Sequence, residues 1–402
     1  MAARLILVFN SGSSTLKFGC FGGVGLDTLA AGAVEWRDGG GAAIVRDGAG
    51  NELLRTNVAV MGHGAAVRNV LSALMECGVV TAGEGRGIAA VGHRIVHGGG
   101  YFRSGVLVDA SVKERIREYA VLAPLHNPPA LEVIEATEAA LGPVPQTAVF
   151  DTAFFADLPL RAQVYPLPWA WHAEWGVRRF GFHGISHEYC ARRIAELDSG
   201  RRSSSIVICH LGGGCSATAV RDGRPIATTM GFTPLEGLMM GTRAGSFDPG
   251  ILIYLQRERG LAPETIAADL NDHSGLLGVS GISHDFREVE RAAGEGNVRA
   301  RLALNIYEDR IRAAIGSLAV TLGEMDTLVF TGGVGEGSAR LRESVCGGLE
   351  CLGVRLDPAK NREPGVDRNL SAPSSRATIW VVQTREELMV ARETRRFAAW
   401  TS

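Results

Sequence analysis

The chain has 402 residues, which is enough for two domains that each bury an apolar core. Hydrophobic residues make up 46% and charged residues 21%, an ordinary globular composition that excludes a disordered chain. The formal net charge is only −2, so the overall field gives no reason to expect nucleic acid or an anionic membrane as a partner. Any anion must therefore be bound by a local site.

The first apolar run, Leu5–Phe9, is too short for a signal-peptide core and has no small-residue cleavage site after it. No other segment is apolar for long enough to span a bilayer. The seven cysteines are scattered and form no CxxC pair. This pattern predicts reduced, mostly buried thiols in a cytoplasmic protein.

The pattern that opens the chain is repeated near its middle. Each copy is a strand, a Gly-rich turn and a second strand: Leu5–Phe9 with Thr15–Phe21, and Ile206–Cys209 with Ala217–Val220. Asn10 and His210, each of which closes the first strand of its copy, lie 200 positions apart (210 − 10), about half the chain. The repeat predicts two duplicated α/β domains.

A third Gly-rich loop, Gly332–Gly337, follows the predicted strand Thr327–Thr331. Amphipathic patterns predict helices at Val112–Leu122, Ala130–Leu141, Ser186–Leu197, Ala300–Leu322, Ala339–Leu352 and Glu386–Phe397. The last helix is too short to form a domain, so we expect it to pack back on the first. The predicted domains are 1–150 with 386–402, and 151–385.

The first loop, Asn10–Lys17, combines small residues, hydroxyl groups and one cation. Glycine lets the backbone approach a phosphate, and backbone amides and hydroxyls can donate hydrogen bonds to its oxygens. The P-loop pattern GxxxxGK[ST] is absent. Each Gly-rich loop alone fits an ordinary turn about as well, but three of them at strand ends favour a divided nucleotide site.

Two arginines lie in glycine-flanked segments: Arg94 in GHRIVHGG and Arg243 in GTRAG. Packing explains such arginines poorly, whereas a guanidinium offers a fork of donors that suits a carboxylate or a phosphate. For either arginine taken alone, an ordinary surface role is the alternative.

His183 and His187 have the i,i+4 spacing of a zinc pair. We reject zinc because the HExxH glutamate is absent and no third ligand is apparent nearby, and we expect His187 to serve in capping or packing. His126 fits a structural loop or an active-site donor about equally. Asp151, directly after a strand, fits either a catalytic or metal-orienting carboxylate or an N-cap.

Two other enzyme classes are excluded by their missing motifs. The GxSxG of serine hydrolases is absent. GGVGEG lies near the C-terminal end, and no suitable acidic residue follows it after a second strand, which argues against a Rossmann oxidoreductase.

Taken together, the motifs resemble those of the acetate kinase family. LILVFNSGSSTLK is similar to the first family motif and IVICHLGGGCSATAVRDG to the second. The segments VGHRIVHGG, APLHNPPA, VFDTAFF, FGFHGISH, TPLEGLMMGTRAGSFDPG, DFRE, FTGGVGEGS and TREELMVARET follow the order and spacing of the family. The similarity runs from Leu5 to Thr394.

The resemblance implies the superfold of acetate and sugar kinases, Hsp70 and actin. Its expected form is two duplicated actin-like (ribonuclease H-like) α/β domains with the active site in the interdomain cleft, usually in a homodimer. The implied reaction is the reversible, Mg²⁺-dependent transfer of the γ-phosphoryl group of ATP to acetate, giving acetyl phosphate and ADP. Mn²⁺ is an alternative to Mg²⁺.

The resemblance also implies roles for individual residues. Asn10 and Glu386 would hold the metal. The catalytic side chains would be Asp151, Arg94, His183, Arg243 and His126, with Arg94 also binding the carboxylate substrate. The acyl pocket would consist of Val96, Leu125, Phe182 and Pro234. The nucleotide and its phosphates would contact Ser13, Thr15, Lys17, His210, Leu211, Gly212, Gly213, Gly214, Asp285, Phe286, Arg287, Gly333, Val334, Gly335, Glu336 and Gly337.

These roles fit the chemistry of the reaction. An acetate oxygen is already anionic, so its attack on the γ-phosphorus needs little help from a general base. Positive charge and hydrogen-bond donors must instead hold two repelling anions in line. We therefore expect Asp151 to orient a metal-bound water or an arginine, and we expect direct in-line transfer without a phosphoenzyme.

The sequence departs from the family pattern at Gly213, Gly337 and Arg385, where the family usually has asparagine. The first two positions leave the preferred phosphoryl donor open. Related propionate kinases tend to have a smaller residue at the Val96 position, so valine favours acetate.

Two alternatives remain. The substrate could be propionate or another short-chain fatty acid, or the chain could be a non-catalytic nucleotide-binding module of the same fold. Arg94, Asp151 and Arg243 argue against the module, because a nucleotide switch has no need of an arginine that binds a carboxylate.

Overall fold

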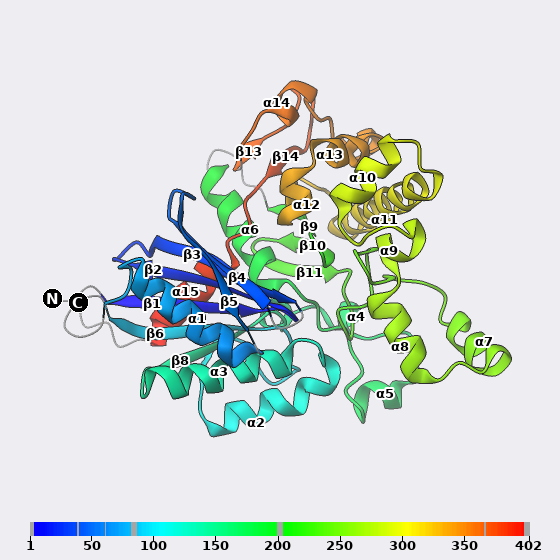
Figure 1. The fold of residues 1–402 in the computed structure, drawn as a ribbon. Coiled ribbons are helices and arrows are strands. Elements are labelled where there is room, and N and C mark those ends of the chain that lie inside the picture. Colours follow the sequence, from blue (N-terminus) through cyan, green and yellow to red (C-terminus); the bar gives the residue numbers. More distant parts are fainter. Residues whose placement is uncertain are drawn as a thin grey trace. The chain divides into compact units, whose positions relative to one another are not determined.

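The computed structural model describes residues 4–37, 40–60, 62–81, 87–198, 204–365 and 367–397. The chain forms two compact units: Met1–Ala156 with Arg385–Ser402 (unit 1), and Asp157–Thr384 (unit 2). Each unit is built from strands and helices around one sheet (Figure 1). Among the described residues, every helix is too short or too polar to cross a lipid bilayer.

The unit boundaries differ from the predicted domain boundaries by a few residues. The sequence places them after residues 150 and 385, whereas the units divide after Ala156 and Thr384. Asp151 belongs to unit 1, because its backbone N–H donates to Ile95 O at 2.9 Å and its side chain binds Arg94. Residues 1–3 and 398–402 of the predicted first domain lie outside the described residues.

The sheet of unit 1 has eight strands in the order β5-β4-β3-β2-β1-β6-β8-β7. The strands are β1 (Leu5–Ser11), β2 (Thr15–Gly22), β3 (Asp27–Arg37), β4 (Gly40–Asp47), β5 (Glu52–Ala59), β6 (Ile88–Ile95), β7 (Val106–Leu107) and β8 (Gln146–Phe150). β1, β6 and β8 are parallel, and the other neighbours are antiparallel. The carboxyl ends of β1, β6 and β8 therefore lie at one edge of the sheet.

The helices of unit 1 are α1 (His63–Glu76), α2 (Ala110–Glu118), η1 (Tyr119–Leu122), α3 (Asn127–Leu141), η2 (Ala153–Phe155) and α15 (Glu386–Phe397). α1 packs on β2, β3, β4 and β5, whereas α15 packs on β1, β2, β6 and β8. The last helix of the chain thus completes the first unit.

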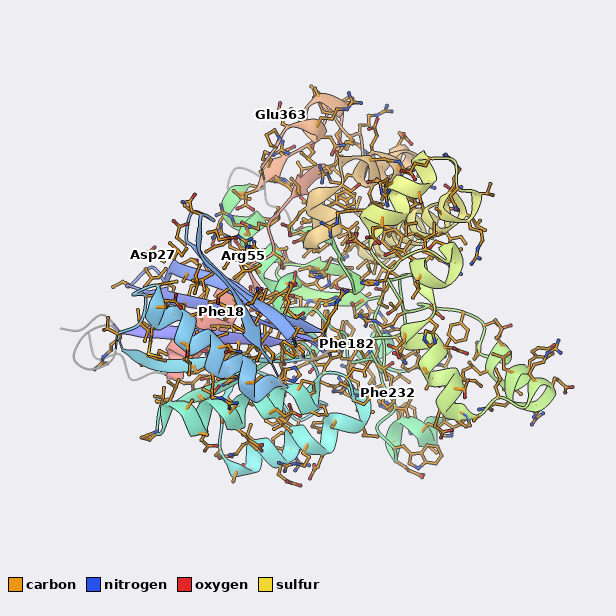
Figure 2. All side chains as sticks on the ribbon, in the orientation of Figure 1. Phe18, Asp27, Arg55, Phe182, Phe232 and Glu363 are labelled. Carbon is orange, nitrogen blue, oxygen red and sulfur yellow. The ribbon has the colours of Figure 1, made fainter. Side chains whose placement is uncertain are left out.

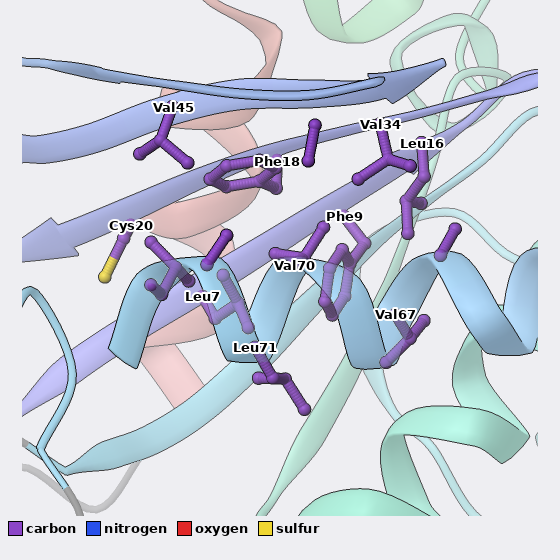
Figure 3. Close-up of a cluster of buried hydrophobic side chains, with 14 of the residues drawn as sticks. Leu7, Phe9, Leu16, Phe18, Cys20, Val34, Val45, Val67, Val70 and Leu71 are labelled. Carbon is purple, nitrogen blue, oxygen red and sulfur yellow. The ribbon is translucent and has the colours of Figure 1, made fainter. Parts of the chain in front are cut away.

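The two faces of β1 serve different purposes, because successive residues of a strand point to opposite sides. Leu7 and Phe9 join the apolar cluster beneath α1 (Figure 3). Asn10 points to the other face, where it contacts α15. Gly92 on β6 lets α15 come close, since a Cβ there would lie only 2.3 Å from Thr394 Oγ1. This close packing brings the beginning of α15 to the polar end of β1.

The sheet of unit 2 has six strands in the order β11-β10-β9-β12-β14-β13. They are β9 (Ser205–Leu211), β10 (Cys215–Arg221), β11 (Arg224–Thr228), β12 (Thr327–Thr331), β13 (Arg368–Asn369) and β14 (Thr378–Val381). β9, β12 and β14 are parallel, and the remaining neighbours are antiparallel.

The long helix α11 packs on β9, β10 and β11. The helices of unit 2 are α4 (Leu160–Gln163), α5 (Trp169–Ala173), α6 (Gly184–Leu197), α7 (Gly250–Arg259), α8 (Pro263–Asp272), α9 (Gly275–Ser280), α10 (Phe286–Gly294), α11 (Val298–Leu322), α12 (Gly332–Gly337), α13 (Ala339–Cys346), η3 (Glu350–Leu352) and α14 (Pro358–Arg362).

The two sheets share one plan. The order β3-β2-β1-β6-β8 in unit 1 matches β11-β10-β9-β12-β14 in unit 2, with the same parallel and antiparallel pairs. Asn10 on β1 and His210 on β9 occupy corresponding places, each next to the end of a central strand. The repeat read from the sequence is therefore a repeat of the sheet.

Most predicted elements are present, but two helices end earlier than predicted. The helix expected at 339–352 stops at Cys346, because Gly347 and Gly348 follow and Gly348 has φ +96°; η3 replaces its last turn. The helix expected at 112–122 becomes η1 after Glu118. The sequence did not predict β3, β4 and β5, in which half-exposed residues give a weak apolar signal.

Candidate active site

Arg94 and Asp151 meet at the carboxyl edge of the unit 1 sheet. Arg94 lies near the end of β6, and Asp151 follows β8 directly. The guanidinium makes a two-pronged contact with the carboxylate, with Nε to Oδ1 at 3.0 Å and Nη2 to Oδ2 at 2.7 Å. Asp151 is 1% exposed, so this pair is held away from water. The N-cap alternative for Asp151 does not apply, since its carboxylate binds Arg94 and the cap position of η2 is the next residue.

A second carboxylate contacts the same arginine. Glu386, the first residue of α15, accepts from Arg94 Nη1 at 2.8 Å. Asn10 Oδ1 accepts from Nη1 at 3.2 Å, and Asn10 Nδ2 donates to Glu386 Oε2 at 3.4 Å and to Glu387 Oε1 at 3.2 Å. Burial lowers the pKa of Arg94, but the carboxylates of Asp151 and Glu386 more than offset this, and the net pKa lies above its ordinary value. Arg94 therefore stays protonated, and the carboxylates of Asp151 and Glu386 already balance its positive charge.

The other oxygen of Glu386 is buried and has no hydrogen-bond partner among the residues that the structure describes. A buried, unpartnered carboxylate oxygen is costly unless a cation or donor reaches it. In the described ranges, no group of three or more His, Cys, Asp or Glu side chains is arranged to hold a metal. Mg²⁺ needs no such cage, because it is typically held by one or two carboxylates, water and substrate phosphates. Glu386 and Asn10 fit that donor set.

Three hydrogen bonds tie the loops around Arg94 together. Gly98 N donates to Thr152 Oγ1 at 3.0 Å, which joins the segments that follow β6 and β8. Asn127, completely buried at the start of α3, accepts from His97 N at 3.1 Å and donates to His97 O at 2.9 Å. These contacts fix Val96 and the start of α3, where the predicted site residues Leu125 and His126 lie. Leu125 is half exposed and His126 partly buried.

The remaining predicted residues of unit 1 lie in the turn between β1 and β2 and at the start of β2. Ser13 and Lys17 are exposed, and Thr15 is partly buried. Gly12 N donates to Thr15 O at 2.7 Å, which closes the turn. Lys17 pairs with Asn10 across the hairpin, so both belong to the same end of the sheet.

In unit 2 the predicted residues His183 and Arg243 meet at Gly214. A Cβ on Gly214 would lie 2.9 Å from Arg243 Nη2 and 3.1 Å from His183 Nε2, so any other residue would fill the space that both groups face. Arg243 Nη1 donates to Pro234 O at 2.7 Å, which brings the predicted acyl-pocket residue Pro234 to the same place. Phe182, labelled in Figure 2, precedes His183 and is buried.

Arg243 differs from Arg94 in its charge balance. Burial lowers the pKa of Arg243, and within the described ranges no carboxylate forms an ion pair with it. A half-buried guanidinium without a close counter-ion is suited to bind an anion. A bound carboxylate or phosphate would form charge-assisted hydrogen bonds with it and so replace the hydration that the guanidinium has lost.

His183 is held by a chain of hydrogen bonds. Its Nδ1 lies 2.9 Å from Ser216 Oγ, and His187 Nε2 lies 2.7 Å from the same hydroxyl. The His183 ring also stacks on His210 at 4.3 Å between centroids. Burial lowers the pKa of His187 well below its ordinary value, so His187 is neutral. If His187 donates to Ser216 and Ser216 donates to His183 Nδ1, the proton of His183 lies on Nε2, which faces Gly214.

A pocket of about 430 Å³ lies beside the Gly-rich loops of unit 2. Its lining includes eight predicted nucleotide-binding residues: Gly212, Gly213, Asp285, Phe286, Arg287, Gly333, Val334 and Gly337. It also includes four that the sequence analysis missed: Leu276, His284, Glu290 and Ser338. A Cβ at Gly213 or Gly337 would meet no atom of the described residues within 4 Å, so a side chain would find open space at either position.

Other predicted nucleotide-binding residues lie outside this lining: His210, Leu211, Gly214, Gly335 and Glu336. Leu211 and Gly335 are buried. The carboxylate of Glu336 accepts from backbone N–H groups of its own unit, so its role in the structure is internal. Asp285 caps α10 through Arg287 N and pairs with the Arg287 side chain, which lowers the pKa of Asp285.

A model of the acetokinase family matches residues 5–392 of the chain. The chain belongs to the acetokinase family. An acetate kinase of Cyanothece sp. is 45% identical over 397 residues, covering 96% of this chain and 97% of the relative.

Solved structures of the family agree with this assignment. The crystal structure of Porphyromonas gingivalis acetate kinase matches with a TM-score of 0.88 and 40% identity, covering 98% of this chain and 99% of that one. A propionate kinase from Francisella tularensis matches with a TM-score of 0.90 and 35% identity, covering 98% and 100%. The predicted fold class, duplicated actin-like α/β domains, is confirmed.

Five small polar residues that hold the predicted site residues in place could not be singled out from the sequence. Asn127, Thr152, Ser186, Ser216 and Thr384 are hydrogen-bonded to predicted site residues or to the loops that carry them. All five lie in or directly beside the family motifs. Their small polar side chains gave no signal of their own, because many turns contain such residues.

The buried His93, next to Arg94, should make the stability of this protein sensitive to acid. It is 1% exposed, and its Nε2 lies 2.6 Å from Gln146 Oε1. Burial lowers the pKa of His93 from 6.5 to about 4. The unfolded chain therefore binds this proton below pH 6.5 and the folded chain does not, so stability falls as the pH drops from 6.5 towards 4.

We expect His93→Gln to flatten the decline in unfolding free energy between pH 7 and pH 5, measured by urea unfolding. Across the full window from 6.5 to about 4, His93 accounts for about 3 kcal/mol at 1.36 kcal/mol per pH unit. His273→Gln, at an exposed histidine, is the control. Parallel pH profiles for wild type and His93→Gln would contradict the prediction.

Proposed function

We propose that this protein is an acetate kinase that reversibly transfers the γ-phosphoryl group of ATP to acetate, giving acetyl phosphate and ADP. Membership of the acetokinase family supports the reaction class. The observation that carries the proposal is the pair of His183 and Arg243 at Gly214, where an unneutralised guanidinium and an imidazole face one space. Such a pair suits a transferring phosphoryl group, whose equatorial oxygens carry the charge.

The mechanism needs no proton abstraction from the acceptor. Acetate is already an anion, and the barrier lies in bringing it against a triphosphate. Arg243 and His183 Nε2 would hold the phosphoryl oxygens, and the glycines at 212, 213, 333 and 337 would leave room for the nucleotide. Direct in-line transfer then requires no phosphorylated side chain.

Arg94 has less freedom than the sequence suggested. Of the five N–H groups of a guanidinium, four donate to Asp151, Asn10 and Glu386. Within the described contacts, one Nη2 hydrogen remains for the acetate carboxylate. We therefore propose two roles for Arg94: it offers this donor to acetate, and it holds Asp151 and Glu386 in position.

Glu386 and Asn10 are the residues that would hold Mg²⁺, with Mn²⁺ as an alternative. The buried, unpartnered Oε1 of Glu386 supports this proposal. Bound there, the ion would neutralise charge on phosphate oxygens. Asp151, already bound to Arg94, orients the arginine.

Acetate is the proposed acyl substrate, with Val96, Leu125, Phe182 and Pro234 setting its size. The solved structure of a propionate kinase is as similar in fold as that of an acetate kinase, so propionate is the second candidate. One methylene in an apolar pocket changes binding by only about 1–3 kcal/mol, so some propionate turnover is expected.

A homodimer and a cytoplasmic location complete the proposal. Large apolar side chains of unit 2 that face solvent would suit a subunit interface: Leu160, Trp169, Trp175, Ile253 and Tyr254. All seven cysteines are free thiols, which fits a reducing compartment.

The direct test is an assay of acyl phosphate formation from acetate, propionate and butyrate with MgATP. A second series compares other phosphoryl donors, because the departures from the family pattern at Gly213 and Gly337 leave the preferred donor undecided. We expect the highest kcat/KM with acetate and ATP. Nucleotide binding without acyl phosphate from any acid would instead support a binding module of the same fold.

Replacing Arg94 or Arg243 with alanine should have different effects on the stability of the protein. Arg94→Ala leaves two buried carboxylates without their counter-ion, so we expect a loss of about 3–5 kcal/mol in unfolding free energy. Arg243→Ala removes an unpaired, half-buried cation, so stability should be unchanged or higher, while kcat falls by about 10²–10³-fold. Urea unfolding and steady-state kinetics on both variants measure this. Equal destabilisation would refute the charge balance described above.

Val96→Ala should shift the ratio of kcat/KM for propionate over acetate upwards by about tenfold, because it opens the acyl pocket by two methyl groups. Val108→Ala, at another partly buried valine of unit 1, serves as the matched control. An unchanged ratio in Val96→Ala would place the acyl pocket elsewhere.

A further inference from the structure

The segment that leaves the unit 2 sheet is held by hydrogen bonds to β12 and to the Gly-rich loop that follows β12. After β14, Val382 N donates to Phe330 O at 3.0 Å and Thr384 N donates to Glu336 Oε1 at 2.8 Å. Glu336 lies in α12, between the pocket-lining residues Val334 and Gly337. Its Oε1 also accepts from Gly332 N at 2.9 Å, so one carboxylate oxygen joins the loop after β12 to Thr384.

The side chain of Thr384 makes the second connection. Its Oγ1 lies 3.1 Å from Ser186 Oγ, and Ser186 Oγ lies 2.8 Å from His210 Nδ1. Ser186 is completely buried. His210 is followed closely by Gly212 and Gly213 of the pocket lining, and its ring stacks on His183. Thr384 thus bonds directly to Glu336 in the loop after β12, and through Ser186 it reaches His210 on β9, the strand that leads into the other loop of the nucleotide pocket.

Two residues further along the chain is Glu386, whose buried Oε1 has no hydrogen-bond partner within the described part of the chain. Only Arg385 separates it from Thr384, and α15 begins at Glu386 itself. The backbone is therefore short and partly constrained between the pocket loops and the proposed metal ligand. If Thr384 moves, either the backbone of Arg385 changes its conformation or Glu386 moves as well.

We propose that Thr384 is a positioning residue that couples nucleotide binding at the Gly-rich loops to Mg²⁺ binding at Glu386. The Thr384–Ser186–His210 hydrogen bonds hold the chain two residues before Glu386 when the pocket is occupied. The coupling rests on the proposed function, because it assumes the metal site at Glu386 and the nucleotide in the pocket.

The test measures ADP binding by calorimetry, in EDTA and at a series of Mg²⁺ concentrations, without turnover. Thr384→Val keeps the backbone N–H bond to Glu336 and removes only the hydroxyl bridge. We expect nearly unchanged affinity for metal-free ADP and a Mg²⁺ half-saturation raised about 3- to 10-fold, the effect of one lost hydrogen bond. Thr384→Ser should retain the wild-type response.

Ser186→Ala cuts the same bridge from its other end. It should raise the Mg²⁺ half-saturation to a similar degree, and the double variant Thr384→Val/Ser186→Ala should be no worse than either single one. Thr378→Val is the matched control, because it removes a buried Thr–Thr hydrogen bond of 2.8 Å on β14 without touching the bridge.

Two results would overturn the coupling. One is a Mg²⁺ response in Thr384→Val and Ser186→Ala equal to that of wild type. The other is an equal loss in Thr378→Val, which would show that general loosening of unit 2 is the cause. If ADP binding to the wild-type protein does not respond to Mg²⁺ at all, the coupling fails, whereas the proposed function fails only if no acid yields an acyl phosphate in the kinase assay.

Discussion

A half-buried guanidinium without a counter-ion is the feature on which the proposed chemistry depends. Arg243 has lost part of its hydration, and among the described residues no carboxylate forms a close ion pair with it; Asp272 offsets the effect of burial only in part and from a distance. Its position is possible because Gly214 has no side chain. Arg94 shows the opposite arrangement, since Asp151 and Glu386 neutralise it. One arginine is thus available to an incoming anion, and the other mainly organises the carboxylates around it.

The duplicated sheet explains why the site residues gather where they do. In unit 1, Asn10, Arg94 and Asp151 lie at the carboxyl ends of three parallel strands. In unit 2, His210 and the Gly-rich loop after β12 occupy the corresponding edge. Ligands of open α/β sheets bind at such edges, because loops that leave neighbouring parallel strands meet there. The two sheets thus have the same strand order, but different side chains lie at their carboxyl ends.

The sequence predicted β1, β2, β9, β10, β12 and the strand before Asp151, because their apolar runs are continuous and glycine-containing turns follow most of them. It did not predict β6, which lies between β1 and β8. It also predicted the last helix, and its motifs named candidate residues that the structure brings together around Arg94 and around Gly214. It could not reveal that Arg94 is already neutralised, because Glu386 lies 292 positions away and only the folding of α15 onto β6 brings it close. The polar residues that orient the site, such as Ser216 and Asn127, escaped prediction because their partners are set by tertiary packing.

The most direct measurement is a crystal structure of the protein with a non-hydrolysable ATP analogue, Mg²⁺ and acetate. The account predicts that terminal phosphate oxygens lie within hydrogen-bond distance of Arg243 and of His183 Nε2, while Arg94 keeps its contacts with Asp151 and Glu386. A terminal phosphate bound away from Gly214, with Arg243 still unpaired, would contradict it.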